Sequence, residues 1–212
     1  MPGKLIESYR RLLFAEGNQF IASEFAVQKV AQIIKRFNVK NVLEVGLGIG
    51  SISGSVLAAF GNRELNYHGT EVNEFCLKAL NENLGECYKM IRIFKGIKEV
   101  DTSLKYDLVI IDGKDEHLKD LKKLIAENGI IAVEGDRLSQ LASLKEKFPN
   151  YKYVHLISLK RNSGTGPFPE NSWQGGLKII FAHPTWQQKM WWLKEKVKTK
   201  LKYQYPGRYF GS

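Results

Sequence analysis

The segment Asn41-Val-Leu-Glu-Val-Gly-Leu-Gly-Ile-Gly-Ser-Ile-Ser53 decides how the rest of the chain is interpreted. It opens with an apolar run that predicts a buried strand, and residues 51–60 predict a helix. Between them, Gly46, Gly48 and Gly50 stand at alternate positions. Glycine lets the backbone approach a ligand closely, and a helix N-terminus exposes free N–H groups. The segment therefore predicts a nucleotide-type site between a strand and a helix.

The spacing of the glycines separates two kinds of nucleotide site. In the dinucleotide fingerprint G-x-G-x-x-G, the third glycine would fall on Ser51, one residue after Gly50. The pattern present is instead Glu44-x-Gly46-x-Gly48-x-Gly50. It resembles the first motif of class I S-adenosylmethionine (SAM)-dependent methyltransferases, in which the glycines pass under the methionine part of SAM. The resemblance implies that the three glycines bind SAM and that Glu44 helps to hold its ammonium end.

Length and composition indicate a globular protein with one main domain. The chain has 212 residues, of which 43% are apolar and 25% are charged. No apolar run is long enough to span a bilayer, and the N-terminus lacks the apolar core of a signal peptide. Cys76 and Cys87 are too few for a disulfide framework or a zinc site. We therefore expect a cytoplasmic protein.

Strand and helix patterns alternate along the chain and predict an α/β fold. Strands are expected at 41–45, 65–70, 89–94, 106–112, 129–134, 151–159 and 176–182, and helices at 4–16, 24–37, 51–60, 73–83 and 118–129. A further helix is expected to contain Leu141, Leu144 and Phe148 and to stop at Pro149. The last two strands have no helix between them, which favours antiparallel pairing. Over residues 20–183 this order resembles the whole methyltransferase domain. The resemblance implies a Rossmann-like three-layer sandwich, with a mostly parallel seven-stranded sheet and a C-terminal antiparallel β-hairpin.

Glu71 is the candidate for binding the ribose of SAM. It ends the second expected strand, 21 residues after Gly50, and a carboxylate there can accept both ribose hydroxyls. The resemblance also places Val72 near the adenine, and Gly96 and Ile97 around the adenine ring. The acidic residue that many relatives carry beside those two is missing. The alternative for Glu71 is a solvent-facing residue at a strand end.

Candidate catalytic residues follow the fourth expected strand. Asp112 stands at its tip, where open α/β sheets place their ligands, so we assign it both a cofactor-binding and a catalytic role. Methyl transfer needs alignment of acceptor and methyl carbon, and a base can remove the acceptor proton. Lys114, Asp115 and His117 are further candidates, of which His117 titrates nearest to neutral pH. The alternative for His117 is a surface residue in the first turn of a helix.

The sequence also resembles a metal-dependent subgroup of O-methyltransferases. These enzymes hold Mg²⁺ with an Asp after strand four and an acidic or amide pair after strand five. Asp112 matches the first ligand, whereas Glu134 and Asp136 flank Gly135 at the second place. Because Mg²⁺ prefers few carboxylates plus waters, Asp112, Glu134 and Asp136 form the candidate metal site.

The connection 160–175 between the last two expected strands is rich in Gly, Pro, Asn and Ser. We expect it to hang over the strand ends as a lid or acceptor wall. Trp173 within it is a candidate for stacking on a sugar or an aromatic acceptor, and the alternative is an aromatic residue that simply packs in the hairpin.

Residues 184–212 are expected to form a basic helix and tail that follow the SAM-binding domain, 1–183. From Thr185 onward there are seven Lys or Arg and one Glu, so this stretch carries +6 of the net charge of +10. Apolar residues recur at helical spacing: Trp186, Met190, Leu193, Val197 and Leu201. With lysines between them, they indicate an amphipathic helix for an anionic membrane surface, at which the protein would be peripheral. The alternative is a helix docked on its own domain or on a second subunit of a homodimer.

We interpret the chain as a SAM-dependent methyltransferase acting on a hydroxyl of a small molecule or a glycan. One alternative is an aminopropyltransferase like the polyamine synthases. Those enzymes carry an acidic pair for the amine, and Asp112 with Asp115 fits that pair only loosely. Another is a binding or membrane-associated protein that kept the fold without catalysis. A nucleic-acid partner is not expected, because Asp112-Gly-Lys-Asp115 replaces the Asn/Asp-Pro-Pro-aromatic motif of base-methylating enzymes.

Overall fold

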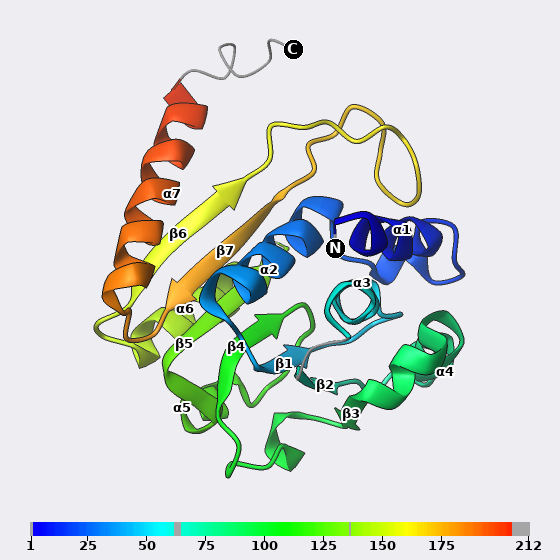
Figure 1. The fold of residues 1–212 in the computed structure, drawn as a ribbon, viewed down its shortest axis with the longest axis horizontal. Helices are drawn as coiled ribbons and strands as arrows, with labels where there is room; N and C mark the ends of the chain where they lie inside the picture. The colour runs from blue at the N-terminus through cyan, green and yellow to red at the C-terminus, as the bar shows by residue number, and fades with distance from the viewer. Residues whose placement is uncertain (1, 62–64, 136, 205–212) are drawn as a thin grey trace.

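The computed structural model describes residues 2–61, 65–135 and 137–204. Within these residues a seven-stranded sheet has the order β3-β2-β1-β4-β5-β7-β6 (Figure 1). Its strands are β1 (Asn41–Val45), β2 (Asn66–Thr70), β3 (Ile91–Phe94), β4 (Tyr106–Ile111), β5 (Ile125–Glu134), β6 (Lys152–Ile157) and β7 (Gly176–Phe181). All neighbouring pairs are parallel except those of β7, which is antiparallel to β5 and β6. The predicted mostly parallel sheet with a C-terminal antiparallel hairpin is confirmed.

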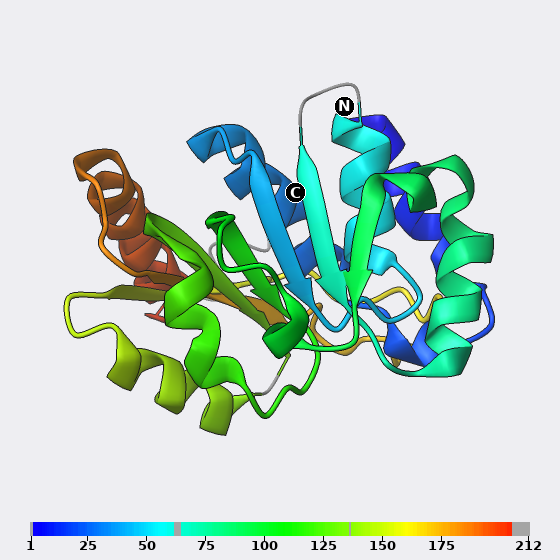
Figure 2. The ribbon, with the colours of Figure 1, turned by 90° about the horizontal axis from the view of Figure 1, so that it is seen from below.

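Helices cover both faces of the sheet (Figure 2). The α-helices are α1 (Pro2–Leu12), α2 (Glu24–Phe37), α3 (Ser51–Phe60), α4 (Glu74–Leu84), α5 (Leu121–Leu124), α6 (Leu138–Lys147) and α7 (Trp186–Gln204). Short 3₁₀ turns are η1 (Asn18–Phe20), η2 (Gly85–Met90), η3 (Ile97–Glu99) and η4 (Leu118–Asp120). Side chains of α1 to α4 share one buried cluster with the sheet, and those of α5 and α6 share another. The predicted three-layer sandwich is confirmed.

The central strand β4 shows why the sheet is buried on both faces. Successive side chains of a strand point to opposite faces, and β4 is apolar at almost every position. Leu108 and Ile110 belong to the cluster under α1 to α4, whereas Val109 and Ile111 belong to the cluster under α5 and α6. The C-terminal end of β4 therefore lies at the centre of the domain, between two helical layers.

Local signals placed most helix ends correctly, and one helix was predicted wrongly. Ser23 caps α2 as expected, because its hydroxyl accepts a hydrogen bond of 3.2 Å from the Ala26 N–H. The helix expected at 118–129 is instead η4 followed by one turn of α5. Ile125 leaves the helical path because it pairs with Tyr106 of β4, and after a register shift Leu108 pairs with Ile130. Sheet pairing outweighs the helical spacing of the apolar residues here.

The helix α7 lies along β6, the last strand of the sheet (Figure 1). Its side chains donate to three β6 carbonyls: Trp192 to Tyr153 at 2.7 Å, Thr199 to His155 at 3.0 Å, and Lys202 to Ile157 at 2.7 Å. These carbonyls belong to alternate residues of β6 and face the edge of the sheet. The helix α7 therefore covers backbone carbonyls that could otherwise pair with a strand of another chain. One face of the helix thus docks on its own domain, as one of the two interpretations expected.

None of the helices in the described part of the chain is both long enough and apolar enough to cross a membrane. Residues 205–212 of the expected tail lie outside the described residues, and the boundary at residue 183 stays a prediction.

Candidate functional site

A cavity of about 400 Å³ lies at the C-terminal ends of β1, β2, β4 and β5. That volume is in the range of small-molecule sites, and this edge is where open α/β sheets bind ligands. The cavity is lined by Gln19, Phe20, Ile21, Gly46, Gly48, Thr70, Glu71, Val72, Asn73, Cys76, Lys95, Asp112, Gly113, Lys114, Asp115, Glu134 and Arg137. The predicted residues Gly46, Gly48, Glu71, Val72 and Asp112 are therefore brought together, whereas Gly50, the N-cap of α3, faces Leu80 and Leu84 of α4.

The glycine loop needs its glycines for backbone conformation and for space. Gly46, Gly48 and Gly50 have φ of 87°, 55° and 95°, in the left-handed region. A Cβ on Gly46 would lie 2.4 Å from the Cα of Gly113, which follows β4. The N–H of Gly113 donates to the Val45 carbonyl at 2.6 Å, so the backbones after β1 and β4 are in direct contact. The close packing of these two loops at the cavity therefore requires glycine at position 46.

Glu71 lies against this loop. Its carboxylate accepts hydrogen bonds from the N–H groups of Gly48 at 2.8 Å and of Val72 and Asn73 at 2.9 Å each. One oxygen accepts from Gly48 and the other from the two residues that follow Glu71. Because a carboxylate has about four acceptor positions, it retains capacity for a ligand hydroxyl. Glu71 is thus held at the cavity wall.

Glu44 is placed differently from its expected partners. It is fully buried, one residue before the end of β1, and is absent from the cavity lining in the part of the chain that the structure describes. The Tyr67 hydroxyl donates to one carboxylate oxygen at 2.5 Å, and the other oxygen has no partner among the described residues. Burial raises the pKa of Glu44 to about 8, against the opposing effect of the Tyr67 hydrogen bond. Its position under α3 gives it no direct access to a ligand in the cavity.

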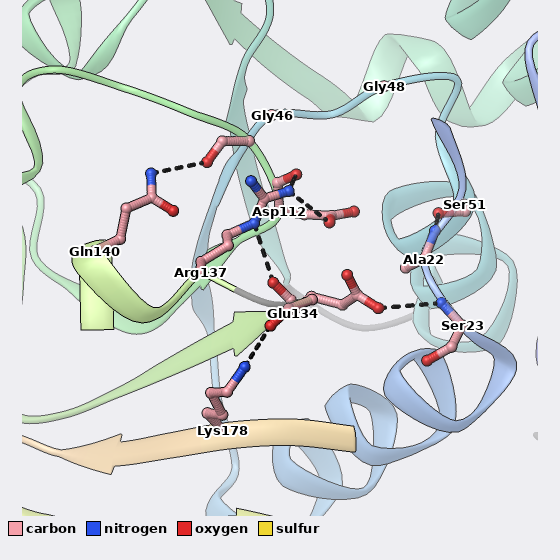
Figure 3. Close-up of polar contacts among 12 residues, drawn as sticks. Ala22, Ser23, Gly46, Gly48, Ser51, Asp112, Glu134, Arg137, Gln140 and Lys178 are labelled. Carbon is pink, nitrogen blue, oxygen red and sulfur yellow. Dashed lines mark hydrogen bonds and ion pairs between the residues drawn. The ribbon is translucent and has the colours of Figure 1, made fainter. Parts of the chain in front are cut away.

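On the other side of the cavity, Arg137 joins the ends of β4 and β5 (Figure 3). Its guanidinium donates to the carbonyl of Asp112, lies 3.5 Å from the Asp112 carboxylate, and donates to the Glu134 carbonyl at 3.0 Å. The Glu134 carboxylate accepts from the Ser23 N–H at 3.3 Å. Burial raises the pKa of Asp112 well above its usual range, and the charges of Glu134 and Glu44 add to this, whereas Arg137 opposes it.

The expected magnesium site is not seen among the described residues. Over residues 2–61, 65–135 and 137–204, no three His, Cys, Asp or Glu side chains cluster closely enough to hold a metal ion. Asp112 and Glu134 are both present, but the cation beside them is the Arg137 guanidinium. Asp136 lies outside the described residues. The described residues therefore give the metal prediction no support.

Asp115 connects the loops that follow β4 and β3. Its carboxylate accepts from the Ile97 N–H at 3.0 Å and from the His117 N–H at 2.7 Å. Asp115 and the exposed Lys114 line the cavity, whereas His117, Gly96 and Ile97 do not line it among the described residues. The imidazole Nδ1 of His117 is buried without a hydrogen-bond partner in the same part of the chain. An acidic side chain from the loop after β4 thus lies beside Gly96 and Ile97.

Several lining residues were not predicted, in particular Gln19, Phe20 and Ile21 before α2. The Ala22 N–H donates to the Ser51 hydroxyl at 2.9 Å and so ties this segment to the start of α3. No local pattern marks residues 19–21, because they reach the cavity through that tertiary contact. Arg137 was visible only as a basic residue after the fifth strand.

The connection 160–175 does not line this cavity within the described residues. The guanidinium of Arg161 stacks on the ring of Trp173 at 3.9 Å, and the two residues form an isolated β-bridge. The connection extends toward α1 (Figure 1), where a Cβ on Gly166 would lie 2.9 Å from a Leu13 side-chain atom. The expected acceptor wall is therefore not formed by this connection.

No protein-family model matches this sequence, and no curated protein matches it. Solved structures do match. The O-methyltransferase from Bacillus cereus in complex with SAH is 12% identical, with a TM-score of 0.59 over 85% of this chain and 90% of that one. The SAH-bound methyltransferase PaMTH1 of Podospora anserina is 15% identical, with a TM-score of 0.59 over 86% and 88% of the two chains.

A third structure, the precorrin-6y C5,15-methyltransferase from Geobacter metallireducens, is 16% identical, with a TM-score of 0.53 over 74% of this chain and 89% of that one. Sequence identities this low support a similarity of fold and nothing more. The similarity agrees with the strand order and the final antiparallel pair. The chain therefore has the Rossmann-like fold of the class I SAM-dependent methyltransferases.

Proposed function

We propose that the protein is a SAM-dependent methyltransferase that methylates a hydroxyl of a small molecule or a glycan. The observation that carries the proposal is the cavity wall in which the Glu71 carboxylate lies 2.8 Å from the Gly48 nitrogen, at the turn between β1 and α3. A carboxylate beside a bare glycine backbone suits a nucleoside. The carboxylate accepts hydrogen bonds from the ribose hydroxyls, and glycine, which has no side chain, lets the backbone approach the ligand closely.

The lining residues suit the parts of SAM. Glu71 would accept the ribose hydroxyls, and the exposed side chain of Val72 would lie against the adenine. The methionine end carries an ammonium and a carboxylate, and the facing wall offers groups of both signs, Asp112 and Arg137 among them. When bound, SAM supplies a methyl group on a positively charged sulfur, which an acceptor oxygen displaces in line.

Asp112 is the best supported candidate for the general base. It lines the cavity, and its raised pKa allows it to hold a proton taken from a hydroxyl. Arg137 holds the Asp112 backbone carbonyl and faces its carboxylate, so it fixes the position of the base. Lys114 is exposed at the cavity, where its cation would stabilise a developing oxyanion. His117 is less well supported because it is not among the lining residues.

Titration calorimetry with SAM and with SAH, its demethylated product, tests the proposal. We expect the wild type to bind both and Glu71→Ala to bind about 10- to 100-fold more weakly, because charge-assisted hydrogen bonds are lost. Glu82→Ala, on the exposed side of α4, is the matched control and should bind normally. No binding by the wild type at millimolar ligand would end the proposal, provided that a cooperative thermal transition shows the protein to be folded.

The aminopropyltransferase alternative has one observation in its favour, because Asp112 and Asp115 both line the cavity. An acidic pair can hold an amine, but here Arg137 already faces Asp112 and Asp115 is bonded to two N–H groups. Titration with decarboxylated SAM distinguishes the two functions. Tighter binding of decarboxylated SAM than of SAM, with transfer of an aminopropyl group to a diamine, would replace our proposal.

A further inference from the structure

The helix α7 has a second face, whose apolar side chains are largely exposed. It consists of Trp186, Met190, Leu193, Val197 and Leu201, which we call the outer stripe. These side chains are between 36% and 76% exposed, and their spacing of three or four residues places them on one side of the helix. The docked residues Trp192, Thr199 and Lys202 lie on the opposite side. The helix therefore exposes the apolar side chains that a docked helix would normally bury.

Positive charges border the outer stripe on both sides. At 3.6 residues per turn, Lys189, Lys196 and Lys200 lie along one side of the stripe, and Lys194 and Lys198 lie along the other. All five lysines are exposed. Glu195, the one acidic residue in the α7 sequence, has a side chain only 13% exposed and pairs with Lys198 at 2.7 Å. The outward surface of α7 is therefore apolar in the middle and cationic at its margins.

We propose that the outer stripe and its lysines bind the surface of an anionic lipid bilayer, with α7 lying parallel to the membrane plane. The apolar side chains would enter the boundary between headgroups and acyl chains, and the lysines would contact lipid phosphates. Lysine suits this position because its aliphatic stem can lie along apolar surface while its ammonium stays among the headgroups. A bilayer satisfies both the apolar and the cationic parts of the surface.

Charge argues against the other occupants. A second copy of this chain, packed stripe to stripe, would bring lysine rows together without a carboxylate on either surface to compensate them. A nucleic acid would pair with the lysines but would leave five apolar side chains in water. No cavity-lining residue belongs to α7, so the bilayer would not cover the site, and the inference does not depend on the proposed function.

Vesicle flotation tests this surface, with phosphatidylcholine vesicles compared with vesicles that also contain phosphatidylglycerol. We expect the full chain to float with the anionic vesicles, to stay behind with the neutral ones, and to be released as salt is raised. The triple variant Met190→Ser, Leu193→Ser, Val197→Ser should reduce anionic binding by about tenfold or more. The triple variant Lys189→Gln, Lys194→Gln, Lys198→Gln should do the same.

A matched control is the triple variant Lys78→Gln, Lys119→Gln, Lys122→Gln, which removes three exposed lysines elsewhere and should bind like the wild type. The proposal is overturned if the wild type does not float with anionic vesicles, or if both α7 variants float as well as it does. A dimer that the serine variant dissociates, without vesicle binding, would assign the stripe to a second copy. Binding of RNA that only the α7 glutamine variant loses, again without flotation, would assign it to nucleic acid.

Discussion

The two walls of the cavity are built in different ways. The β1–β2 wall, which comprises Gly46, Gly48 and Glu71, is mainly backbone, and its carboxylate accepts three N–H groups. The β4–β5 wall consists of the side chains of Asp112, Glu134 and Arg137, and burial there raises the pKa of Asp112. A carboxylate satisfied by N–H groups is suited to hold a ligand, whereas one whose pKa is raised by burial and by neighbouring carboxylates is suited to take a proton. The comparison assigns binding to the first wall and chemistry to the second.

The largest expected effect separates chemistry from binding at Asp112. We expect Asp112→Asn to lower methyl transfer by about 10²- to 10⁴-fold, because the amide cannot accept the acceptor proton. The affinity for SAH should change by less than about tenfold, since a base acts mainly in the transition state. Transfer is measured with labelled SAM and a panel of phenols and sugars. Asp120→Asn, an isosteric change at an ion pair with Lys123, is the control.

If Asp112→Asn instead abolished SAH binding and left transfer unchanged at saturating SAM, the assignment of the two walls would be reversed. A control variant that lost activity to the same extent would show that the loss is not specific to the cavity.

The second expected effect concerns the stability of the β1–β2 wall. Gly46→Ala must adopt a φ of 87° and place a Cβ 2.4 Å from a Gly113 backbone atom. We expect a loss of about 3 kcal/mol in the free energy of unfolding, together with weaker SAH binding. Gly85→Ala must adopt a φ of 51° and a ψ of −124°, which favour glycine, but has no atom within 4 Å of the new Cβ, so it should lose only the strain, about 2 kcal/mol. Urea denaturation of the two variants separates strain from steric overlap, and equal losses would contradict the packing argument.

The third prediction uses Glu44, a β1 residue whose carboxyl resembles that of the opposite wall in its raised pKa. Because its pKa is about 8 in the folded state and about 4.3 in the unfolded chain, the folded protein binds the proton more tightly. The contribution of the protonated Glu44 carboxyl to the free energy of unfolding is therefore complete at low pH, and it is lost as pH rises between those two pKa values. The slope is at most about 1.4 kcal/mol per pH unit.

Glu44→Gln keeps an acceptor for Tyr67 and cannot ionise, so the fall in stability between those pH values should become shallower. Denaturation curves of wild type and variant from pH 5 to 9 make the comparison. Parallel pH profiles would show that Glu44 ionises in the folded state as it does in the unfolded chain.

The smallest expected effect tests the role of Arg137 as the cation of the β4–β5 wall. Because its guanidinium faces Asp112 at 3.5 Å, we expect dialysis against EDTA to change methyl transfer by no more than about twofold. Adding Mg²⁺ afterwards should have a similarly small effect. A loss of activity that Mg²⁺ restores would show that a divalent ion completes this wall.

The sequence predicted the β1–β2 wall better than the β4–β5 wall because the two depend on different ranges of contact. The loop conformation follows from the glycine spacing over a few residues, and Glu71 follows from the end of the next strand. Arg137 meets Asp112 across 25 positions of sequence, and Asp115 meets Ile97 across 18. Such contacts depend on the order of the strands in the sheet, which no local pattern specifies.

The same distinction holds for the mistaken elements. The helix expected to Gly129 was based on the spacing of apolar residues, and the acceptor wall expected from residues 160–175 was based on their loop-like composition. Ile125 joined β4 instead, and the connection reached toward α1 instead of lining the cavity. In each case a partner distant in sequence decided the outcome.

The sequence alone determined the strand–glycine–helix turn at Gly46 to Gly50, the final antiparallel pair and the apolar periodicity of α7, because these depend on φ, chain length and side-chain spacing. The tertiary structure alone decided that Glu44 is buried away from the cavity, that Arg137 faces Asp112, and that the outer stripe of α7 stays exposed. The physical reason is that burial and electrostatic partners are properties of packed surfaces, and packing is established only when distant segments meet.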